Sequence, residues 1–504
     1  MTDSAATTDI DPVLSDARPA AADHSARNNR VIWLLLAASF VVILNETIMG
    51  VALRELMLDL KIDARAAQWL TTAFMLTMAI VIPITGFLLQ RFNTRPIFIA
   101  AMSLFSTGTL LAALSPGFEV LLGARVIQAT GTAVMLPLLM TTIMTLVPAA
   151  QRGKTMGNVS IVISVAPAIG PTISGIILNT LTWRWMFWLV LPIALVMLFI
   201  GFRRVENVSE PERVPLDVLS VILSAFGFGG LIYGLSRIGE HGAADATAAE
   251  QAAAAMPMWI ALGVGATGLA LFIWRQLLLQ RRDRALLDLR TFRSANFSVS
   301  VIVMVVSMAA LFGTIILLPI YMQQVLLLEP LQTGLLLLPG GLLMGLLAPF
   351  VGRLYDRFGP TPLLVPGSII VSTALWTLTT VNESTSPMFL LGAHLVLSLG
   401  LALLFTPLFT SALGSVRPHL YSHASATVGT VQQVAGAAGT ALFVTIMAAT
   451  SATLASEGAS NVTAVAGGVH SAFLAGAVIS LLAVVGSVFV RKPADLPEGI
   501  PVGH

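Results

Sequence analysis

The chain has 504 residues, of which 56% are hydrophobic and only 10% are charged. An ordinary soluble domain has about 25% charged residues, so this chain cannot cover itself with polar surface in water, and we exclude a soluble enzyme. The formal charge is +2 and the basic residues are scattered through short loops, so we expect no nucleic-acid partner. The chain contains no cysteine, which rules out disulfides and thiolate metal sites.

The first thirty residues are polar and rich in alanine and have no apolar stretch before a small-residue cleavage site. We therefore interpret residues 1–30 as a disordered tail and not as a signal peptide. Fourteen apolar segments follow, each close to the roughly 20 residues that a helix needs to cross a bilayer. We predict an all-α membrane protein with spans over residues 31–53, 67–89, 97–115, 120–146, 158–179, 185–202, 216–236, 257–279, 298–322, 333–352, 362–381, 388–412, 424–449 and 470–490.

An even number of spans places both ends of the chain on the same side of the membrane. With a cytoplasmic N-terminus, the inner segments carry most of the Lys and Arg residues outside the spans, and the outer segments carry only Arg54, Lys61, Arg65, Arg184 and Arg237. Since cytoplasmic loops are enriched in Lys and Arg, we predict that both termini are cytoplasmic.

One loop motif occurs twice. After the second span the chain reads Gly86-Phe-Leu-Leu-Gln90-Arg91, and after the tenth it reads Gly352-Arg-Leu-Tyr-Asp356-Arg357. Two six-helix halves related by a weak repeat are typical of transporters that rock around a site near the middle of the membrane. We predict six-helix bundles over residues 31–203 and 281–490, a linker with two extra spans over 204–280, and a tail over 491–504.

Further motifs lie in the fourth, fifth, sixth and ninth spans. They are Arg125-Val-Ile-Gln128-Ala129-Thr-Gly131, Gly170-Pro171-Thr-Ile-Ser-Gly175, Trp183-Arg184-Trp185-Met-Phe187 and Leu318-Pro319-Ile-Tyr321-Met-Gln323. Together with the repeated loop, they resemble the major facilitator superfamily, and specifically its fourteen-span drug/proton antiporter branch. The first span, Leu44-Asn45-Glu46-Thr47-Ile48, is most similar to that of the lincomycin-resistance subgroup. The resemblance covers nearly all of the chain beyond the tail and implies two six-helix bundles around a central cavity.

Glu46 is the only acidic side chain well inside a predicted span, where a carboxylate is costly and usually marks function. We predict that it couples proton movement to the direction in which the cavity opens; a structural hydrogen bond between helices is the alternative. Arg125 is its expected partner because both residues fall in the outer half of the membrane, although an arginine at this depth can also snorkel to the surface. The resemblance implies a proton-handling role for Arg125 and places Asn45 at the position of the family's aspartate, so Asn45 is a further candidate.

Gly170, Pro171 and Gly175 are predicted gating residues. Proline removes a backbone donor and bends the helix, and glycine lets helices approach closely at the seam between the halves. We interpret the segment as a pliable gate, and tight packing alone is the alternative.

The repeated loop supplies the other predicted gating residues. In the family it carries an aspartate, whose charge caps a helix N-terminus of the other half. This chain has Gln90 and Arg91 in the first copy and Asp356 and Arg357 in the second. We therefore expect the first copy to contribute less to gating than the second.

Apolar and amide side chains of the cavity are the candidates for substrate contacts. Residues of these types often serve for packing instead, but a cavity rich in them suits varied amphipathic ligands. The candidates are Gln68, Phe74, Met75, Gln128, Gln323, Gln324, Gln432 and Gln433.

The remaining polar residues suggest no metal and no nucleotide. Histidine can serve as a pH sensor near neutrality, but we interpret His419 and His423 as solvated loop residues, and no pattern indicates a metal site. The chain has no phosphate-binding Gly-x-x-x-x-Gly-Lys sequence. We expect no cofactor, so the energy source is the proton gradient.

The resemblance implies a proton-coupled antiporter that exports hydrophobic or amphipathic drugs by alternating access from a bacterial inner membrane, and not an enzyme. We expect small amphipathic substrates, protons and membrane lipids as its partners, and a monomeric chain. The alternatives are an exporter of one endogenous metabolite or lipid and a membrane sensor that binds ligand without transport.

Overall fold

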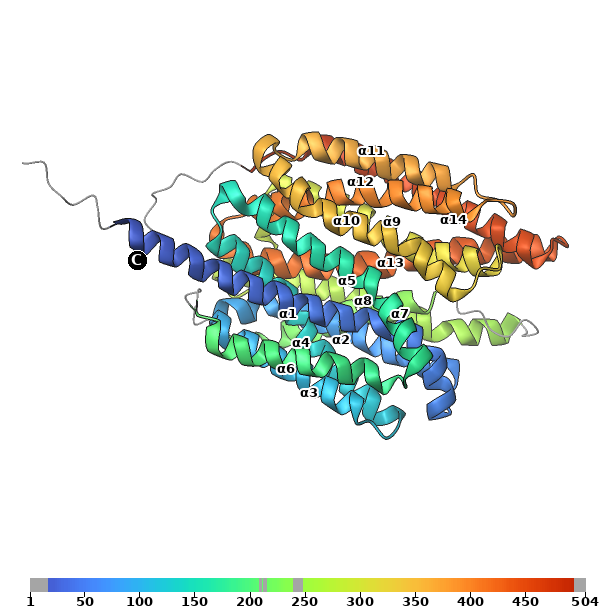
Figure 1. Ribbon diagram of the computed structural model, residues 1–504, viewed down its shortest axis with the longest axis horizontal. Coiled ribbons are helices and arrows are strands. Elements are labelled where there is room, and N and C mark those ends of the chain that lie inside the picture. Colours follow the sequence, from blue (N-terminus) through green and yellow to red (C-terminus); the bar gives the residue numbers. More distant parts are fainter. Residues whose placement is uncertain (1–16, 208–210, 212–214, 239–247, 494–504) are drawn as a thin grey trace, which may run out of the picture.

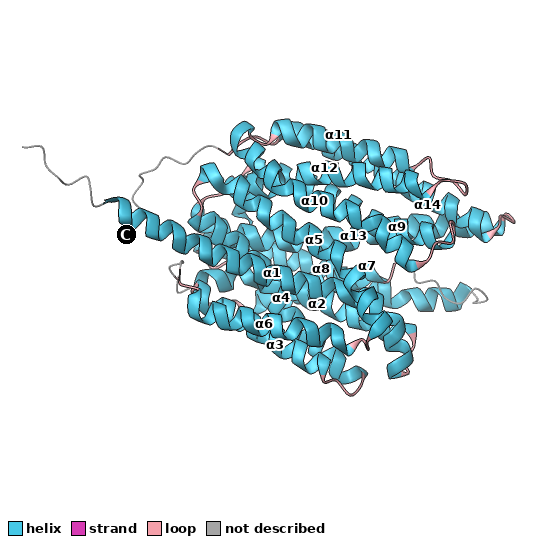
Figure 2. Ribbon diagram, viewed as in Figure 1, coloured by secondary structure: helices cyan, strands magenta, loops and turns pink. Residues whose placement is uncertain are grey.

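The computed structural model describes residues 17–207, 211, 215–238 and 248–493. These residues form helices joined by short loops and include no strand (Figure 2). Fourteen of the helices are long and apolar enough to cross a membrane. The predicted fold class and number of spans are confirmed.

The helices follow the predicted order along the chain. The first six are α1 Ala17–Leu60, α2 Ala64–Arg91, α3 Thr94–Ala113, α4 Phe118–Leu146, α5 Arg152–Thr180 and α6 Arg184–Arg204. The two extra helices are α7 Val218–Ser236 and α8 Ala248–Leu279. The last six are α9 Ala295–Gln324, α10 Pro330–Phe358, α11 Thr361–Leu378, α12 Pro387–Gly414, α13 Tyr421–Ser456 and α14 Asn461–Phe489. Short 3-10 turns are η1 Ala149–Gln151, η2 Gln280–Arg282, η3 Leu289–Arg293 and η4 Pro418–Leu420.

The start of α1 corrects one boundary. Residues 17–30 were predicted to belong to a disordered tail, but they form the first turns of α1. Alanine is the best helix former, and extending a helix that already exists avoids the cost of nucleation. Residues 1–16 and 494–504 of the two predicted tails lie outside the described residues.

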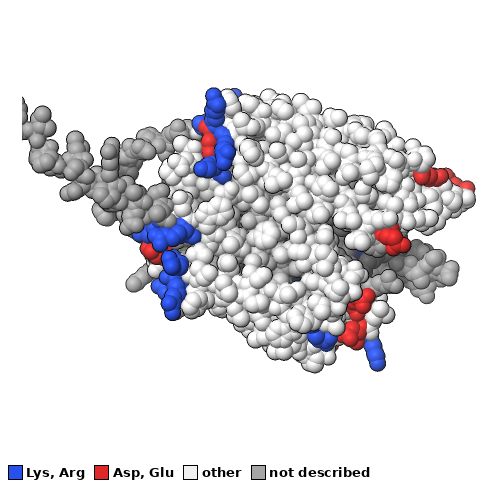
Figure 3. Space-filling view, in the orientation of Figure 1, with Lys and Arg blue, Asp and Glu red and all other residues white. Residues whose placement is uncertain are grey.

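The helices run side by side along the long axis of the molecule (Figure 1). We call the end at which α1 begins and α14 ends the proximal end, and the opposite end the distal end. On the face drawn in Figure 3, charged side chains gather at these two ends and the surface between them carries none. This distribution is expected of a protein whose middle lies in hydrocarbon, where exposed charges are costly.

Two long contacts join the first six helices to the last six: α5 packs along α10, and α2 packs along α13. Glycines bring α5 and α10 together. A β-carbon at Gly345 would lie 2.0 Å from Val165, and one at Gly157 would lie 2.5 Å from the carbonyl oxygen of Ala348. Small residues allow this close approach between helices in a membrane. The α5–α10 contact is therefore a tight seam.

The extra helices pack against each other and lie outside the α2–α13 contact. Backbones meet where Gly227 faces Gly268 and where Gly230 faces Gly265. α7 contacts both α2 and α13. A small apolar core joins these three helices to α8 and to the segment before α9. The buried residues of this core are Ala79, Phe87, Phe228, Ile232, Phe272, Leu286, Leu287 and Ala426.

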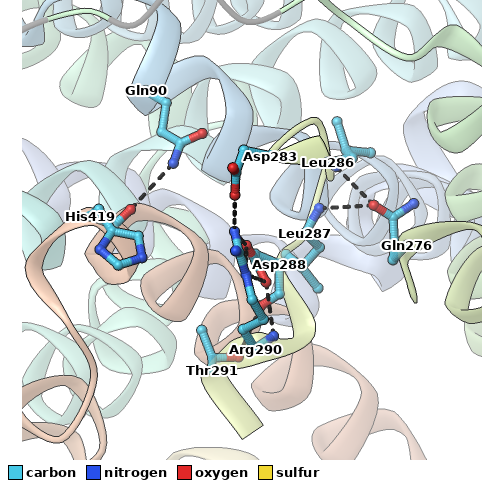
Figure 4. A network of polar contacts seen from close by, with 9 residues as sticks. All are labelled: Gln90, Gln276, Asp283, Leu286, Leu287, Asp288, Arg290, Thr291 and His419. Atoms are coloured by element: carbon cyan, nitrogen blue, oxygen red, sulfur yellow. Dashed lines mark hydrogen bonds and ion pairs between the residues drawn. The ribbon is translucent and has the colours of Figure 1, made fainter. Parts of the chain in front are cut away.

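Polar contacts fix the proximal ends of the extra helices. Asp217, which precedes α7, accepts two hydrogen bonds of 2.6 Å from Arg275 of α8. These bonds hold the pKa of the Asp217 carboxyl at about 2, well below its ordinary range. The buried Gln276 then accepts from the backbone N–H groups of Leu286 and Leu287 (Figure 4). The pair is thereby anchored to the segment that leads into the second half.

Candidate functional site

Arg125 of α4 is buried inside the first six helices, with 1% of its surface exposed. Its Nη1 donates to Oε1 of Gln128 at 2.6 Å and to Oδ1 of Asn45 at 3.5 Å. Its guanidinium carbon lies 4.0 Å from the ring centroid of Phe74. A guanidinium in an apolar interior is tolerated when acceptors and an aromatic face replace its water. Sequence reasoning selected all four residues, and the structure brings them together.

Gln128 is fully buried and links α4 to α3. Its Nε2 donates to the hydroxyl of Thr109 at 2.8 Å, and that hydroxyl donates to the carbonyl oxygen of Phe105. Both ends of the amide are thus occupied within the protein. Gln128 was predicted as a substrate contact, but the structure places it in the network that supports Arg125.

Glu46 lies beside this network in α1. It is close enough to Arg125 for an electrostatic interaction, but the structure describes no ion pair between the two side chains, and the hydrogen bond to Arg125 comes from Asn45. Consecutive residues of a helix point about 100° apart, so Asn45 and Glu46 cannot both face Arg125. The structure thus has a hydrogen bond between Arg125 and the Asn45 amide in place of the ion pair with Glu46 that the sequence predicted. The half-buried Glu46 carboxyl lies next to this hydrogen bond.

The next residue, Thr47, packs against α5. A β-carbon at Gly170 would lie 2.2 Å from the Thr47 hydroxyl oxygen, so the glycine permits the contact between α1 and α5. A β-carbon at Gly175 would meet no atom of another segment within 4 Å, and Pro171 is exposed. The prediction that Gly170 and Gly175 bring the two halves together is therefore wrong. Gly170 packs against α1 within the first half, and Gly175, five residues further along α5, packs against no other helix.

Asp356 joins the proximal ends of the two halves. Its Oδ1 and Oδ2 accept hydrogen bonds of 2.8 Å from the backbone N–H groups of Gly153 and Lys154, in the first turn of α5. A carboxylate is favourable there because free N–H groups and the helix dipole concentrate positive charge at a helix N-terminus. The Arg357 side chain is exposed next to Phe358.

Gln90 makes the corresponding contact from the first copy of the loop. Its Nε2 donates to the carbonyl oxygen of His419, just before α13, at 3.3 Å (Figure 4). This is one long neutral bond, against two short bonds to a charged group for Asp356. Arg91 is exposed beside Phe92.

Comparison with known proteins identifies the family. The model of the Major Facilitator Superfamily matches residues 35–440. The chain belongs to the major facilitator superfamily. Lincomycin resistance protein LmrB of Listeria monocytogenes is 40% identical over 469 residues, which cover 92% of this chain and 96% of that protein. The uncharacterized MFS-type transporter YcnB of Bacillus subtilis is 40% identical over 472 residues, 94% and 97% of the two chains. A multidrug resistance protein B homolog of Mycobacterium tuberculosis is 28% identical over 442 residues, 86% and 79%.

Solved structures agree with this assignment at the level of the fold. The human organic anion transporter MFSD10 has a TM-score of 0.63 and 15% identity, covering 91% of this chain and 99% of that one. The proton:xylose symporter XylE has a TM-score of 0.60 and 13% identity, covering 93% and 97%. This superfamily member is a multi-pass membrane transporter and not an enzyme.

The other predicted substrate residues do not form one site. Phe74 lies under Arg125. Gln68 and Met75 are exposed on α2, and Gln323 and Gln324 are exposed at the distal end of α9. Gln432 and Gln433 are half-buried in α13, and no hydrogen bond of the described residues joins any of these glutamines to another.

An apolar groove that the sequence did not reveal lies between α2, α7 and α8. It holds about 620 Å³ and is open on the outside of the bundle. Trp69 and Tyr233 stack in its wall with ring centroids 5.6 Å apart, and Pro257 of α8 faces them. The two aromatic residues are 164 positions apart in the chain, so only the packing of the extra helices brings them together.

His423 differs from the prediction of a solvated loop residue. It is buried at the start of α13, where a β-carbon at Gly86 of α2 would lie 3.1 Å from its Nδ1. His419, in contrast, is exposed as expected. The described residues include no group of three or more acidic or histidine side chains suited to a metal ion.

Proposed function

We propose that this protein is a proton-coupled antiporter that exports hydrophobic or amphipathic drugs by alternating access. The observation that carries the proposal is the Glu46 carboxyl, half-buried in α1 next to the guanidinium network of Arg125. An ionisable group at this depth is costly and therefore usually marks a functional site. The lincomycin and multidrug resistance named for the relatives supports drugs as the substrate class.

In this proposal the charge of the Glu46 carboxyl changes during transport, and the charge of the Arg125 guanidinium does not. Arg125 is held by hydrogen bonds to Gln128 and Asn45 and by none to Glu46 among the described contacts, so its position does not depend on a bond to that carboxyl. When Glu46 binds a proton, its attraction to the guanidinium disappears while the guanidinium remains in place. When it releases the proton, the attraction returns. The protonation state therefore changes the local electrostatic energy without dismantling the network.

Packing connects this charge to the seam between the halves. Thr47, next to Glu46, contacts Gly170 of α5, and α5 is the helix that packs along α10. A shift of α1 when Glu46 changes charge is transmitted to α5. At the proximal end, Asp356 and Gln90 hold the halves together and must release when the cavity opens there.

The proximal end is the cytoplasmic end in this proposal, so both termini face the cytoplasm of a bacterium. In Figure 3 the basic side chains concentrate at the proximal end, and the distal end shows mainly acidic ones. This is the asymmetry that the positive-inside rule associates with the cytoplasm. No metal or organic cofactor is needed, since the proton gradient supplies the energy.

The test is drug efflux in everted membrane vesicles with an imposed pH gradient. The native protein is expected to move lincomycin and unrelated dyes only while the gradient exists. Glu46→Gln is expected to bind the same compounds but to lose gradient-driven movement. Glu457→Gln is the matched control, because Glu457 is an exposed acid at the distal end of α13.

Full gradient-driven export by Glu46→Gln would contradict the coupling role. Export of a single compound class by the native protein would favour a specific metabolite or lipid exporter. Binding without any movement by the native protein would favour a membrane sensor.

A further inference from the structure

A short sequence is repeated in equivalent helices of the two halves. α4 contains Leu121-Leu-Gly-Ala-Arg125, and α12 contains Leu390-Leu-Gly-Ala-His394. α4 is the fourth helix of the first six, and α12 is the fourth helix of the last six. Arg125 and His394 each lie seven positions after the first residue of their helix. With a rise of 1.5 Å per residue, both lie about 10 Å from the distal ends of their helices. His394 thus occupies the place of Arg125 in the second half.

The imidazole of His394 is buried, with 8% of the residue exposed. Its Nε2 lies 3.2 Å from the carbonyl oxygen of Leu337 in α10. A carbonyl oxygen can only accept, so Nε2 carries the hydrogen and Nδ1 carries the lone pair. Nδ1 is buried without a hydrogen-bond partner. The ring therefore holds an unused basic nitrogen in the interior of the protein.

Glycine makes room for this arrangement. A β-carbon at Gly340 of α10 would lie 2.3 Å from Nε2 of His394 and 2.6 Å from the hydroxyl oxygen of Ser398. Any larger residue at this position would displace the imidazole. The site is accordingly built from α10 and α12 together.

No charged side chain of the described residues lies at this depth on the helices packed against α12. α9 and α11 contain no charged residue, and the titratable residues of α5, α10 and α13 lie at their proximal ends. Tyr321, near the distal end of α9, donates its hydroxyl to Asn382. The titratable and charged groups on these helices are Arg152, Lys154, Tyr321, Arg353, Tyr355, Asp356, Arg357, Tyr421 and His423.

We propose that Nδ1 of His394 is a second proton-binding site of the transport cycle, in the half that lacks Glu46. The proposal rests on the proton coupling proposed above. A proton on Nδ1 creates an imidazolium that is buried with one acceptor, and such a charge is unfavourable until water or another acceptor reaches it. The neutral ring fits the packed contact with α10, and the charged ring favours a conformation in which that contact opens to the cavity.

The two ionisable sites act on opposite sides of the same seam. Next to the glycine that contacts the imidazole, Gly341 packs on Ala168 of α5. Two residues further along α5, Gly170 packs on Thr47, which follows Glu46. Proton binding in either half therefore bears on the α5–α10 contact, which supplies a physical route by which the two sites can influence one another.

The direct test is nuclear magnetic resonance of the full-length protein in detergent with ¹⁵N-labelled histidine. The chain has seven histidines, and the spectrum of His394→Gln identifies the missing signals. The expected result is that Nδ1 of His394 gains a proton as the pH is lowered from about 9 to about 4, and that Glu46→Gln shifts this titration. A single neutral tautomer over the whole range would overturn the proposal.

A transport measurement separates coupling from a structural role. Each coupled proton raises the limiting substrate gradient about tenfold per pH unit, because one pH unit corresponds to a tenfold change in proton activity. His394→Gln keeps a donor for the Leu337 carbonyl, and it is expected to lower the limiting lincomycin gradient in everted vesicles by about tenfold per pH unit. A purely structural residue would change the rate and not the limit.

The matched control is His419→Gln, because the His419 side chain is exposed and its contact with Gln90 uses the backbone carbonyl oxygen, which the substitution keeps. An unchanged limit in His394→Gln would overturn the proposal even if the ring titrates. Absence of gradient-driven export in the native protein would instead refute the proposed function, and the magnetic resonance result would still decide whether His394 binds a proton.

Discussion

Asp356→Asn is expected to weaken the contact that holds the proximal ends of the two halves together. The aspartate bridges the halves by accepting from two N–H groups in the first turn of α5. Asparagine keeps one acceptor oxygen but loses the negative charge and one of the two bonds. The change therefore acts on the bridge with little change of side-chain volume.

The magnitude follows from the cost of removing such a cap. Loss of a capping acceptor costs about 0.5–2 kcal/mol, and loss of a charge at a helix N-terminus costs about 0.3–1 kcal/mol. A total of about 1–3 kcal/mol changes the ratio of the closed to the open proximal end by about 5- to 160-fold. A small open population in the native protein would become readily measurable.

Distance measurements between spin labels suit this chain because it has no native cysteine. Cysteines at Arg204, at the end of α6, and Arg353, in α10, place exposed labels on the two halves at the proximal end. Asp356→Asn is expected to increase the population at long distance. Asp63→Asn is the control, since Asp63 caps α2 at the distal end and joins no helices of different halves.

An unchanged distance distribution in Asp356→Asn would refute the reasoning, provided that the variant melts at the native temperature. An equal shift in Asp63→Asn would also refute it, because the effect would then reflect the loss of any helix cap.

Two further predictions concern packing and pH. Gly170→Ala places a methyl group against Thr47 and is expected to lower the free energy of unfolding by about 1–3 kcal/mol. The measurement is the melting temperature, which should fall in Gly170→Ala and be partly restored by adding Thr47→Ala. Gly175→Ala, where the added methyl group meets open space, should have no such effect. Asp217→Asn removes the ion pair with Arg275 and is expected to cost about 1 kcal/mol, since the pair is partly exposed. Because the folded pKa of Asp217 is lowered to about 2, this stabilisation is present above about pH 4 and is lost as the pH falls through about 2. The melting temperatures of the native protein and of Asp217→Asn should therefore converge as the pH is lowered. A difference in melting temperature that stays constant with pH would contradict the prediction.

The hydrophobic pattern of the chain was enough to predict the fold, because every span must satisfy its own backbone and must be about as long as the bilayer is thick. A repeated loop motif predicted which loops are equivalent, since Gln90 and Asp356 stand at matching places in it. The hydrophobic pattern misplaced the start of α1, because a polar alanine-rich segment can extend a helix without entering the membrane.

The sequence identified the residues of the site better than their contacts. Glu46, Asn45 and Arg125 were selected together, but the structure was needed to show that Asn45 makes the hydrogen bond. Neighbouring residues on a helix point in different directions, so the contacts of each residue depend on how the helix is rotated about its own axis. That rotation is set by packing against other helices, which the sequence alone does not show. The packing partners of Gly170 and Gly175 were wrong for the same reason.

The signal for His394 was present in the sequence as the repeated Leu-Leu-Gly-Ala segment. A lone histidine in a span has no special meaning without knowledge of its neighbours. Its burial, its single hydrogen bond and the glycine beside it emerge only from the structure.

The extra helix pair has a consequence for the movement of the whole protein. α7 touches a helix of each half, α2 and α13, while α8 packs mainly on α7. When the halves rotate against each other, the pair cannot remain fixed to both. Gly229 seats α7 against Leu76 and Ile80 of α2, whereas Gln276 ties α8 to the segment before α9. The pair thus contacts the first half through α2 and the second half through α13 and the segment before α9, and we expect it to limit how far the halves can rotate against each other.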